Sequence, residues 1–414
     1  MYRLFVSAIL ITGSTSAMAD VQALRDDPPG QTALPTKTTS TGSEARTFQL
    51  QPAVTHLMSS WPDAVEIADV TGDGRADVVV TTTSLNNKEN DYHVFVFPQT
   101  AGGQLSAPSK YPYGQTAYRN GLAIVDLDGK HGLDVVVGGD SGITTLFATA
   151  SGTLAVGGLL LSQESRVIEP VDLRGTGRKD LVSLDWTSGY IHYNQGAGAF
   201  LGTPWAVQVS GSSNNIAITD FDGDGHEDIV LTSGGEFPNV QLYRNQGDGS
   251  LRLHRSLSAA CDFFKSVGGV AAGDVNSDGI VDIVATAAFN RPASCLVVHI
   301  GKGDGTFEKP LVLPSYDIPQ TVRIADVNDD GRDDVVVLHA GWGALGIYMQ
   351  QGDGSLTSET LYPIPNASQY SPEALAIGDF SGDGCPDVAI AGYSEGLVTL
   401  LGAGCASIFM DGFD

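Results

Sequence analysis

The sequence has few basic residues and few cysteines, and its central part contains no long apolar segment. Only 22 of its 414 residues are Lys or Arg, against 48 Asp or Glu, and the formal net charge is −26. Nucleic acids and anionic membrane surfaces are bound through clustered Lys and Arg, so this charge argues against both as partners. No apolar run reaches the ~20 residues of a membrane-spanning helix, so we expect no transmembrane segment in the mature chain.

Recognised catalytic motifs are also absent. The chain contains no G-x-S-x-G, no H-E-x-x-H, no Walker loop and no C-x-x-C, and its eight His are scattered. We therefore predict a protein that is not an enzyme. Glycine, by contrast, is abundant at 51 residues without a collagen period, and 42% of the residues are hydrophobic. This composition is typical of a globular protein with many tight turns.

The two ends of the chain differ from its centre. Residues 1–19 combine one Arg, a short apolar run and an Ala-x-Ala ending, which predicts a signal peptide and a secreted, periplasmic or cell-surface protein. A buried strand or helix is the alternative. Residues 20–46 are rich in Pro, Thr, Ser and Gly and are interpreted as a flexible leader. Residues 406–414 form a short aromatic and acidic tail, similar to the endings of some exported bacterial proteins, or a frayed terminus.

A nine-residue segment recurs seven times along the chain. The best-formed copy runs from Asp220 to Asp228 and reads DFDGDGHED. The other copies begin, 46 to 57 residues apart, at Asp69, Asp126, Asp172, Asp274, Asp326 and Asp379. Each copy separates an apolar segment from a β-branched run, which predicts a hairpin. In three units a Gly-Asp-Gly turn about 25 residues later predicts a second hairpin. We name the four strands of each unit A to D. Such units predict an all-β fold, a single seven-bladed β-propeller over residues 47–405.

The spacing within the repeat is that of a metal-binding loop. Oxygen atoms at positions 1, 3 and 5 can converge on one ion, Gly at position 6 permits the bend, and Asp at position 9 adds a ligand. A flexible all-oxygen site suits Ca²⁺ better than Mg²⁺. A metal-free turn is the alternative, but its carboxylates would repel one another. Five copies keep this set and predict about five Ca²⁺ sites: Asp69, Thr71, Asp73, Asp77, Asp220, Asp222, Asp224, Asp228, Asp274, Asn276, Asp278, Asp282, Asp326, Asn328, Asp330, Asp334, Asp379, Ser381, Asp383 and Asp387.

The repeated pattern Asp-x-[Asp/Asn/Ser/Thr]-x-Asp-Gly-x-x-Asp, followed by Val and Ile, resembles the FG-GAP/VCBS repeats of integrin-α-type β-propellers. The resemblance covers roughly residues 47–405 and implies a calcium role for the five complete loops. Two copies depart from it, because Lys130 stands at position 5 of the second copy and Arg174 at position 3 of the third. We hypothesise that these two cations replace the metal by pairing with the remaining carboxylates.

Ring closure and the cysteines follow from the blade assignment. The chain ends before blade 7 has a strand D, so we predict that residues 47–51 supply this outer strand. Four cysteines in an exported chain are expected to be oxidised, and three pairings are possible. The expected positions of the cysteines on the blades favour Cys261–Cys295 and Cys385–Cys405.

The loops between strands B and C carry aromatic residues on the face opposite to the acidic loops. These residues could stack on sugar rings or anchor a protein partner, or pack between blades instead. They are Trp186, Tyr190, Phe237, Phe289, Trp342 and Tyr393, with Tyr118, Arg119, Tyr316 and Asp317 as a polar rim.

Together these features predict an exported, calcium-binding β-propeller that acts as a binding or adhesion module for an extracellular protein or glycan ligand. The alternative is an extracellular polysaccharide-degrading lyase or glycoside hydrolase on a propeller scaffold, because some such enzymes resemble this repeat family. A scaffold subunit without its own ligand is a third reading.

Overall fold

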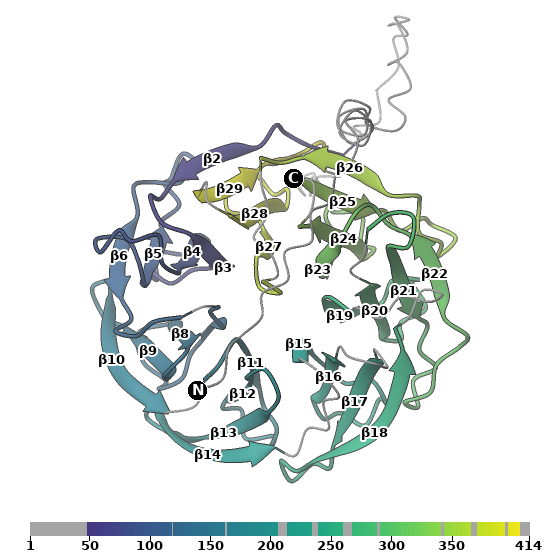
Figure 1. Ribbon diagram of the computed structural model, residues 1–414, viewed down its shortest axis with the longest axis horizontal. Coiled ribbons are helices and arrows are strands. Elements are labelled where there is room, and N and C mark those ends of the chain that lie inside the picture. Colours follow the sequence, from purple (N-terminus) through teal and green to yellow (C-terminus); the bar gives the residue numbers. More distant parts are fainter. Residues whose placement is uncertain are drawn as a thin grey trace, which may run out of the picture. The chain divides into compact units, whose positions relative to one another are not determined.

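Seven four-stranded antiparallel sheets form a ring around a central axis (Figure 1). The described residues of the computed structural model contain no helix, and the predicted all-β, seven-bladed β-propeller is confirmed. The segments 1–47 and 406–414, which hold the predicted signal peptide, leader and tail, lie outside the described residues. The structure describes residues 48–117, 119–161, 164–205, 213–233, 239–259, 267–287, 290–340, 343–365, 371–393 and 396–405.

Blades 1 to 6 each follow the order A, B, C, D along the chain, with strand A nearest the axis (Figure 1). Blade 1 contains β3 (Pro62–Ala68), β4 (Asp77–Thr82), β5 (His93–Phe97) and β6 (Ser109–Pro112). Blade 2 contains β7 (Leu122–Val125), β8 (Asp134–Gly139), β9 (Gly142–Ala148) and β10 (Leu154–Leu161). Blade 3 contains β11 (Val167–Val171), β12 (Asp180–Leu184), β13 (Gly189–Gly196) and β14 (Ala199–Trp205).

The next three blades repeat this arrangement. Blade 4 contains β15 (Ser213–Thr219), β16 (Asp228–Ser233), β17 (Asn239–Asn245) and β18 (Leu251–Ser258). Blade 5 contains β19 (Val270–Gly273), β20 (Asp282–Ala287), β21 (Cys295–His299) and β22 (Leu311–Pro314). Blade 6 contains β23 (Pro319–Ala325), β24 (Asp334–His339), β25 (Ala344–Tyr348) and β26 (Thr360–Pro363).

Blade 7 joins the two ends of the propeller. It contains β27 (Leu375–Gly378), β28 (Asp387–Gly392) and β29 (Gly396–Leu400), and its outer strand is β2 (Val54–Leu57) from the start of the domain. The predicted outer strand at residues 47–51 is therefore wrong by several positions. β1 (Gln49–Leu50) pairs instead with β30 (Gly402–Ala403) in a separate two-stranded sheet. Pro52, which has no N–H for a ladder, lies between β1 and β2.

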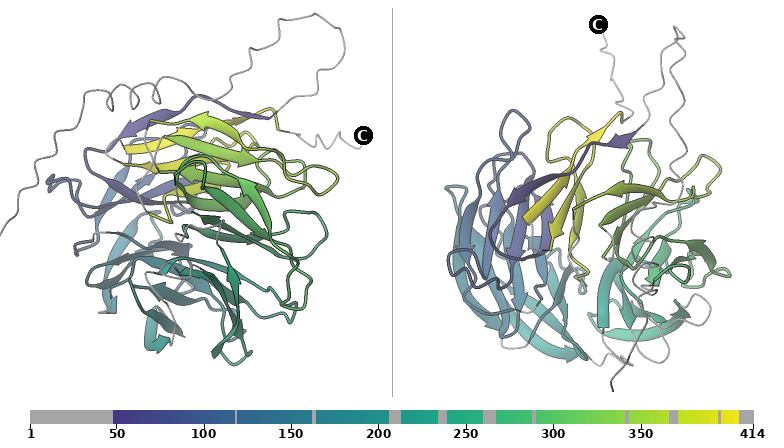
Figure 2. Two further views of the ribbon diagram at one scale, coloured as in Figure 1. Left: turned by 45° about the vertical axis from the view of Figure 1, so that its right-hand side comes forward. Right: turned by 45° about the horizontal axis from the view of Figure 1, so that its top comes forward.

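Strand B is the buried centre of each blade. All residues of β4, β8, β12, β16, β20, β24 and β28 are buried. Neighbouring blades pack face to face around the ring, so a central strand is covered on both faces (Figure 2). This explains why the repeat ends in an unbroken β-branched run rather than in an alternating pattern.

The Gly-Asp-Gly and related turns between strands C and D make the contacts between blades on the acidic-loop face. In six blades, a turn glycine with positive φ packs against position 3 of the acidic loop of the preceding blade. The pairs are Gly103 with Ser381, Gly152 with Thr71, Gly198 with Asp128, Gly249 with Arg174, Gly305 with Asp222 and Gly354 with Asn276. The second sequence repeat is thus needed for blade packing as well as for its own turn.

Blade 7 ends without such a turn, and a disulfide lies in the corresponding place. Cys385, in its acidic loop, is bonded to Cys405, with their Cα atoms 5.6 Å apart. The Sγ atom of Cys405 lies 3.9 Å from the carbonyl oxygen of Val327 in the loop of blade 6. The predicted Cys385–Cys405 disulfide is present, whereas the predicted partner of Cys295, Cys261, lies outside the described residues.

Substitution of a turn glycine tests the contact between blades. We expect Gly152→Ala to lower the free energy of unfolding by at least about 1–3 kcal/mol. A Cβ atom there would lie 2.6 Å from the carbonyl oxygen of Thr71, at a φ of +71°. Gly158→Ala is the matched control, because a Cβ atom at this glycine of β10 has no atom within 4 Å. Equal urea denaturation midpoints for the two variants would contradict the packing role.

Candidate functional site

The seven acidic loops share one backbone conformation. Each connects strand A to strand B, and in every loop the residues at positions 4 and 6 have positive φ. Glycine occupies most of these positions, but Ser277 (φ 61°), Asp329 (φ 56°) and His131 (φ 62°) adopt the same conformation. The glycine preference at position 6 was predicted from the sequence, whereas the one at position 4, where glycine also recurs, was not.

The carboxylate at position 1 organises the loop from within. In the first loop, Asp69 Oδ1 accepts hydrogen bonds from the N–H groups of Gly72 (2.7 Å) and Asp73 (3.1 Å), and Oδ2 accepts one from Gly74 (2.8 Å). The loops from Asp220 and Asp379 have the same three bonds. Position 1 therefore folds the loop around its own side chain, and position 6 brings an N–H rather than a side chain to it.

The aspartate at position 9 is fully buried in all seven loops. One of its oxygens accepts the N–H of a residue near the end of strand C in every blade, for example Gln350 N to Asp334 Oδ1 at 2.8 Å. The six equivalent bonds go to Asp77, Asp134, Asp180, Asp228, Asp282 and Asp387. Position 9 thus joins the loop to strand C of its own blade whether or not a metal is bound.

The fourth loop is the best candidate metal centre. Asp220, Asp222 and Asp224 place ligand atoms within 4.8 Å of one another. Asp222 Oδ1 and Asp228 Oδ2 are buried and have no hydrogen-bond partner among the described residues. Burial, together with the carboxylates of Asp222 and Asp224, raises the pKa of Asp228 to about 7. A buried oxygen without a partner beside three carboxylates fits an oxygen-ligated cation.

One arginine outside the fourth loop, Arg244, pairs with two of its carboxylates. Arg244 Nε lies 2.7 Å from Asp222 Oδ2, and its Nη2 lies 2.7 Å from Asp224 Oδ2. In the first loop, the position-3 hydroxyl of Thr71 is buried and likewise has no partner among the described residues. The first and fourth loops therefore offer oxygen ligands that the described part of the chain leaves unused.

The two loops with a cation differ from each other. Arg174 reaches inward: its Nη2 lies 2.7 Å from Asp180 Oδ1 and donates to the carbonyl oxygen of Asn194 at 2.7 Å. Lys130 stays outside, with Nζ 3.0 Å from Asp128 Oδ2 and a side chain that is 57% exposed. The hypothesis that both cations replace a metal therefore fits Arg174 and does not fit Lys130.

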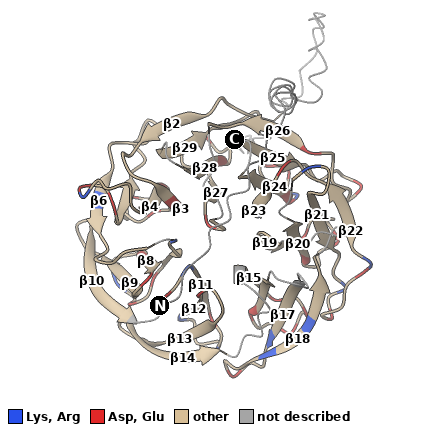
Figure 3. Cartoon of the chain, viewed as in Figure 1, with Lys and Arg blue, Asp and Glu red and all other residues tan. Residues whose placement is uncertain are grey.

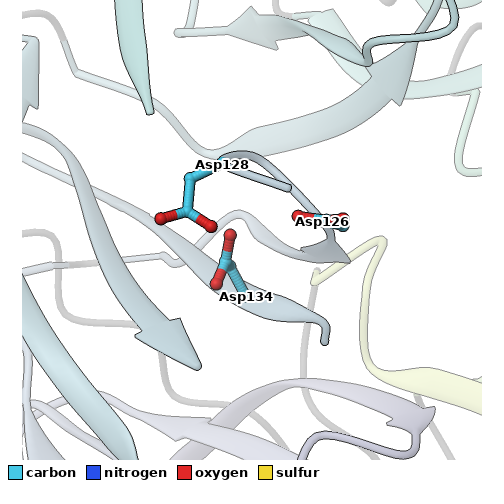
Figure 4. A group of neighbouring side chains, drawn as sticks. All are labelled: Asp126, Asp128 and Asp134. Carbon is cyan, nitrogen blue, oxygen red and sulfur yellow. The ribbon is translucent and has the colours of Figure 1, made fainter. Parts of the chain in front are cut away.

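The second loop keeps its carboxylates together. Asp126, Asp128 and Asp134 place ligand atoms within 4.8 Å of one another, and Figure 4 shows the three carboxylates around one space. The short loop backbone positions them, and Lys130 is too far toward solvent to fill the space between them. The second loop, which its Lys at position 5 excluded from the predicted metal sites, can thus hold a metal ion.

On the opposite face, a cavity of about 340 Å³ opens between blades 7, 1 and 2. The connections B–C and D–A surround it, because antiparallel blades place these on the face away from the A–B loops. Three aromatic residues line it, namely Trp61, Tyr92 and Tyr393. The rings of Trp61 and Tyr393 lie 5.2 Å apart at 30°. The other lining residues are Pro62, Asp63, Thr83, Ser84, Ala117, Arg119 and Asp140.

The predicted aromatic surface is only partly brought together. Tyr393 and Arg119 line the cavity, but Trp61 and Tyr92 were missed. Trp61 comes just before strand A rather than in a B–C loop, whereas Tyr92 lies in the B–C loop of blade 1 and was overlooked. Trp186 is 40% exposed and stacks on Arg166, whose Cζ lies 3.3 Å from the ring centroid. Tyr190 stacks on His192 with centroids 6.3 Å apart. Phe237, Phe289, Trp342 and Tyr118 lie outside the described residues.

The predicted rim residues Tyr316 and Asp317 belong to a separate cluster in blades 5 and 6. Arg291 Cζ lies 4.5 Å from the Tyr316 ring, and Asp317 Oδ1 accepts the N–H of Arg291. His339, completely buried beneath Tyr316, lies 2.7 Å from Glu359 Oε1. These bonds hold the cluster together within the blades.

Glu373, which precedes strand A of blade 7, bonds to three other blades near the axis of the ring. Its carboxylate accepts hydrogen bonds from Leu122 in blade 2 and Ile168 in blade 3, and its carbonyl oxygen accepts one from Val65 in blade 1. Burial raises the pKa of Glu373 well above its usual value, and Glu169 raises it further. A single residue at the entry to blade 7 therefore bonds to three other blades, two through its side chain and one through its backbone carbonyl, which no sequence pattern indicated.

These features define a β-propeller with acidic A–B hairpins. The FG-GAP-like repeat profile matches residues 69–137, 172–231, 220–285, 274–337 and 326–390, which together make up more than half of the chain. The chain belongs to the FG-GAP-like repeat family. No curated protein sequence matches it. Within the described residues, no helix is long and apolar enough to cross a bilayer.

Solved propellers share the fold at low sequence identity. A lectin of Agrocybe aegerita that recognises non-reducing terminal N-acetylglucosamine has a TM-score of 0.55 and 18% identity, over 76% of this chain and 84% of that one. BBS1N, solved in complex with ARL6DN, has a TM-score of 0.55 and 15% identity, over 85% of this chain and 95% of that one. Virginiamycin B lyase from Staphylococcus aureus has a TM-score of 0.53 and 13% identity, over 86% of this chain and 99% of that one. These likenesses show the fold alone.

The two cation-bearing loops give opposite predictions. We expect Arg174→Ala to lower the free energy of unfolding by about 3 kcal/mol, because it leaves the completely buried Asp180 unpaired. Lys130→Ala removes an exposed ion pair and should cost less than about 1 kcal/mol. Urea denaturation at fixed calcium concentration measures both values. A large loss for Lys130→Ala, or none for Arg174→Ala, would show that the assignment is wrong.

Proposed function

We propose that the protein is an exported, calcium-stabilised β-propeller that binds an extracellular glycan in the cavity between blades 7, 1 and 2. The observation that carries this proposal is the aromatic pair of Trp61 and Tyr393 in a cavity whose other walls are polar. Sugar rings combine an apolar face with a rim of hydroxyls, so they are bound by aromatic rings next to hydrogen-bonding groups.

Calcium and ligand are assigned to opposite faces. The A–B loops would hold the metal, and their role in this chain is structural, because each loop also packs against the next blade. The few Lys and Arg of the domain include Arg252 and Arg255 on the outer strand β18, away from the cavity (Figure 3). Acidic loops without a cation would repel one another, so calcium is expected to stabilise the ring rather than contact the glycan.

Removing calcium tests the structural role. We expect EDTA to lower the melting temperature of the full chain markedly, because a ligand that binds only the folded state stabilises it by about 2.7 kcal/mol at 100 times its Kd. Calorimetric titration of the metal-free protein should then show one fewer Ca²⁺ bound by Asp224→Ala than by the wild type. Asp248→Ala is the control, since among the described residues this exposed aspartate of blade 4 accepts hydrogen bonds only from Ser250. An EDTA-insensitive melting temperature would sink the calcium assignment.

Glycan binding is tested with the calcium-loaded full chain on a glycan array. We expect Trp61→Ala to weaken binding to the glycans that the wild-type protein binds by at least tenfold, or about 1.4 kcal/mol, because it removes one ring of the aromatic pair. Tyr316→Ala, on the same face but outside the cavity, should leave binding unchanged.

Three outcomes contradict the proposal. Binding to no glycan would remove the glycan assignment and leave a protein ligand as the alternative. Equal effects of the two variants would place the binding site elsewhere. Release of shortened or unsaturated products during incubation would show an enzyme on a propeller scaffold instead of a binding module.

A further inference from the structure

The cavity between blades 7, 1 and 2 contains a buried carboxylate that is only half satisfied. Asp63, in β3, is 7% exposed, and its Oδ2 accepts the N–H of Asn120 at 2.6 Å. Its Oδ1 has no hydrogen-bond partner in the part of the chain that the structure describes. Because Asp63 lines the cavity, this oxygen is a candidate acceptor for a bound molecule.

The charges that line the cavity do not cancel. Asp63 and Asp140 contribute two carboxylates, and Arg119 contributes one guanidinium. Burial raises the pKa of Asp63 to about 6, although Arg119 and Arg166 favour its ionised form. At neutral pH, Asp63 is therefore mostly ionised and the lining carries a net negative charge.

Arg166, the second arginine near the cavity, does not cancel the net negative charge of the cavity lining. Arg166 is not a lining residue of the cavity and lies over the ring of Trp186, 3.3 Å from the centroid. Its charge is attracted by the carboxylates of Glu164 and Asp185 as well as by Asp63. Arg166 therefore has anionic neighbours of its own, and the chain as a whole carries a formal charge of −26. An anionic sugar would have to approach against this field.

The aromatic lining favours a cation for a separate reason. The faces of aromatic rings are electronegative and attract ammonium groups within about 6 Å of the centroid. Trp61, Tyr92 and Tyr393 line the same cavity as Asp63. The volume, about 340 Å³, lies near the lower end of the ~300–1,000 Å³ of small-molecule sites, which suits one sugar residue rather than a long chain segment.

We propose that the cavity binds a sugar residue that carries a protonated amine, such as the glucosamine at the end of a glycan. The amine donates to the free oxygen of Asp63, and the sugar ring packs against Trp61 and Tyr393. This inference rests on the proposed glycan function and specifies the chemical class of the ligand.

The test compares three oligosaccharides of equal length that differ in one charged group. Isothermal titration of the calcium-loaded full chain at pH 7.5 uses tetramers of glucosamine, of N-acetylglucosamine and of a uronic acid. We expect the glucosamine tetramer to bind at least about tenfold more tightly than the N-acetylated one, since a charge-assisted hydrogen bond contributes about 1.5–3 kcal/mol. The uronic acid tetramer should bind most weakly.

Two variants locate the effect. Asp63→Asn keeps an acceptor for Asn120 but removes the charge, so it should bring the glucosamine and N-acetylglucosamine affinities to within about threefold of each other. Glu89→Gln is the matched control, because this exposed acid belongs to the B–C loop of blade 1 but does not line the cavity. It should leave the affinity ratio unchanged. Melting temperatures in calcium confirm that both variants are folded.

The outcomes separate this inference from the function on which it rests. Equal or tighter binding of the N-acetylated or uronic acid tetramer would overturn the amine assignment and leave a glycan-binding protein. A glucosamine preference that survives Asp63→Asn would overturn the role of this cavity. If the protein binds none of the three tetramers and no glycan on the array, the proposed function itself would be wrong.

Discussion

A buried aspartate at the start of each strand B holds three segments of its blade together. In five of the seven blades its second oxygen accepts the N–H at position 2 of the acidic loop, while the first accepts an N–H near the end of strand C. A carboxylate with no exposure is tolerated only where such partners are present, so the loop, strand B and strand C must fold in one register. The third and fourth loops depart from this pattern, one by receiving Arg174 and the other by leaving Asp228 Oδ2 without a partner.

The same loops connect neighbouring blades. Position 3 of each of six loops packs against a turn glycine of the next blade, and the disulfide of blade 7 lies against the loop of blade 6. A cation bound by positions 1, 3 and 5 would therefore fix both its own hairpin and the contact between two blades. The acidic loops that could hold a metal thus lie on one face of the ring, and the cavity lined by Trp61, Asp63 and Tyr393 lies on the opposite face.

Much of the fold could be predicted because the repeat is local. The nine-residue spacing, the glycine at position 6 and the β-branched run each constrain only a few neighbouring residues, and seven copies reinforce the same conclusion. The closing strand was misplaced by a few residues because Pro52 divides the N-terminal segment, and the pairing of β2 with β29 joins residues more than 300 positions apart. The pairing of Cys385 with Cys405 followed from blade positions alone.

The sequence by itself determined the number of blades, the acidic loops and the face on which each loop lies, because these depend on short-range spacing and on the alternation of antiparallel strands. Only the tertiary structure decided which side chains meet across blades. The sequence led to the same predicted role for Lys130 and Arg174, yet one is exposed and the other pairs with a buried aspartate. Trp61, Asp63, Arg119 and Tyr393 come from three blade connections and one strand, and Glu373 bonds to blades 1, 2 and 3 from the entry to blade 7. Such contacts depend on how the ring closes, and ring closure is a property of all seven blades together.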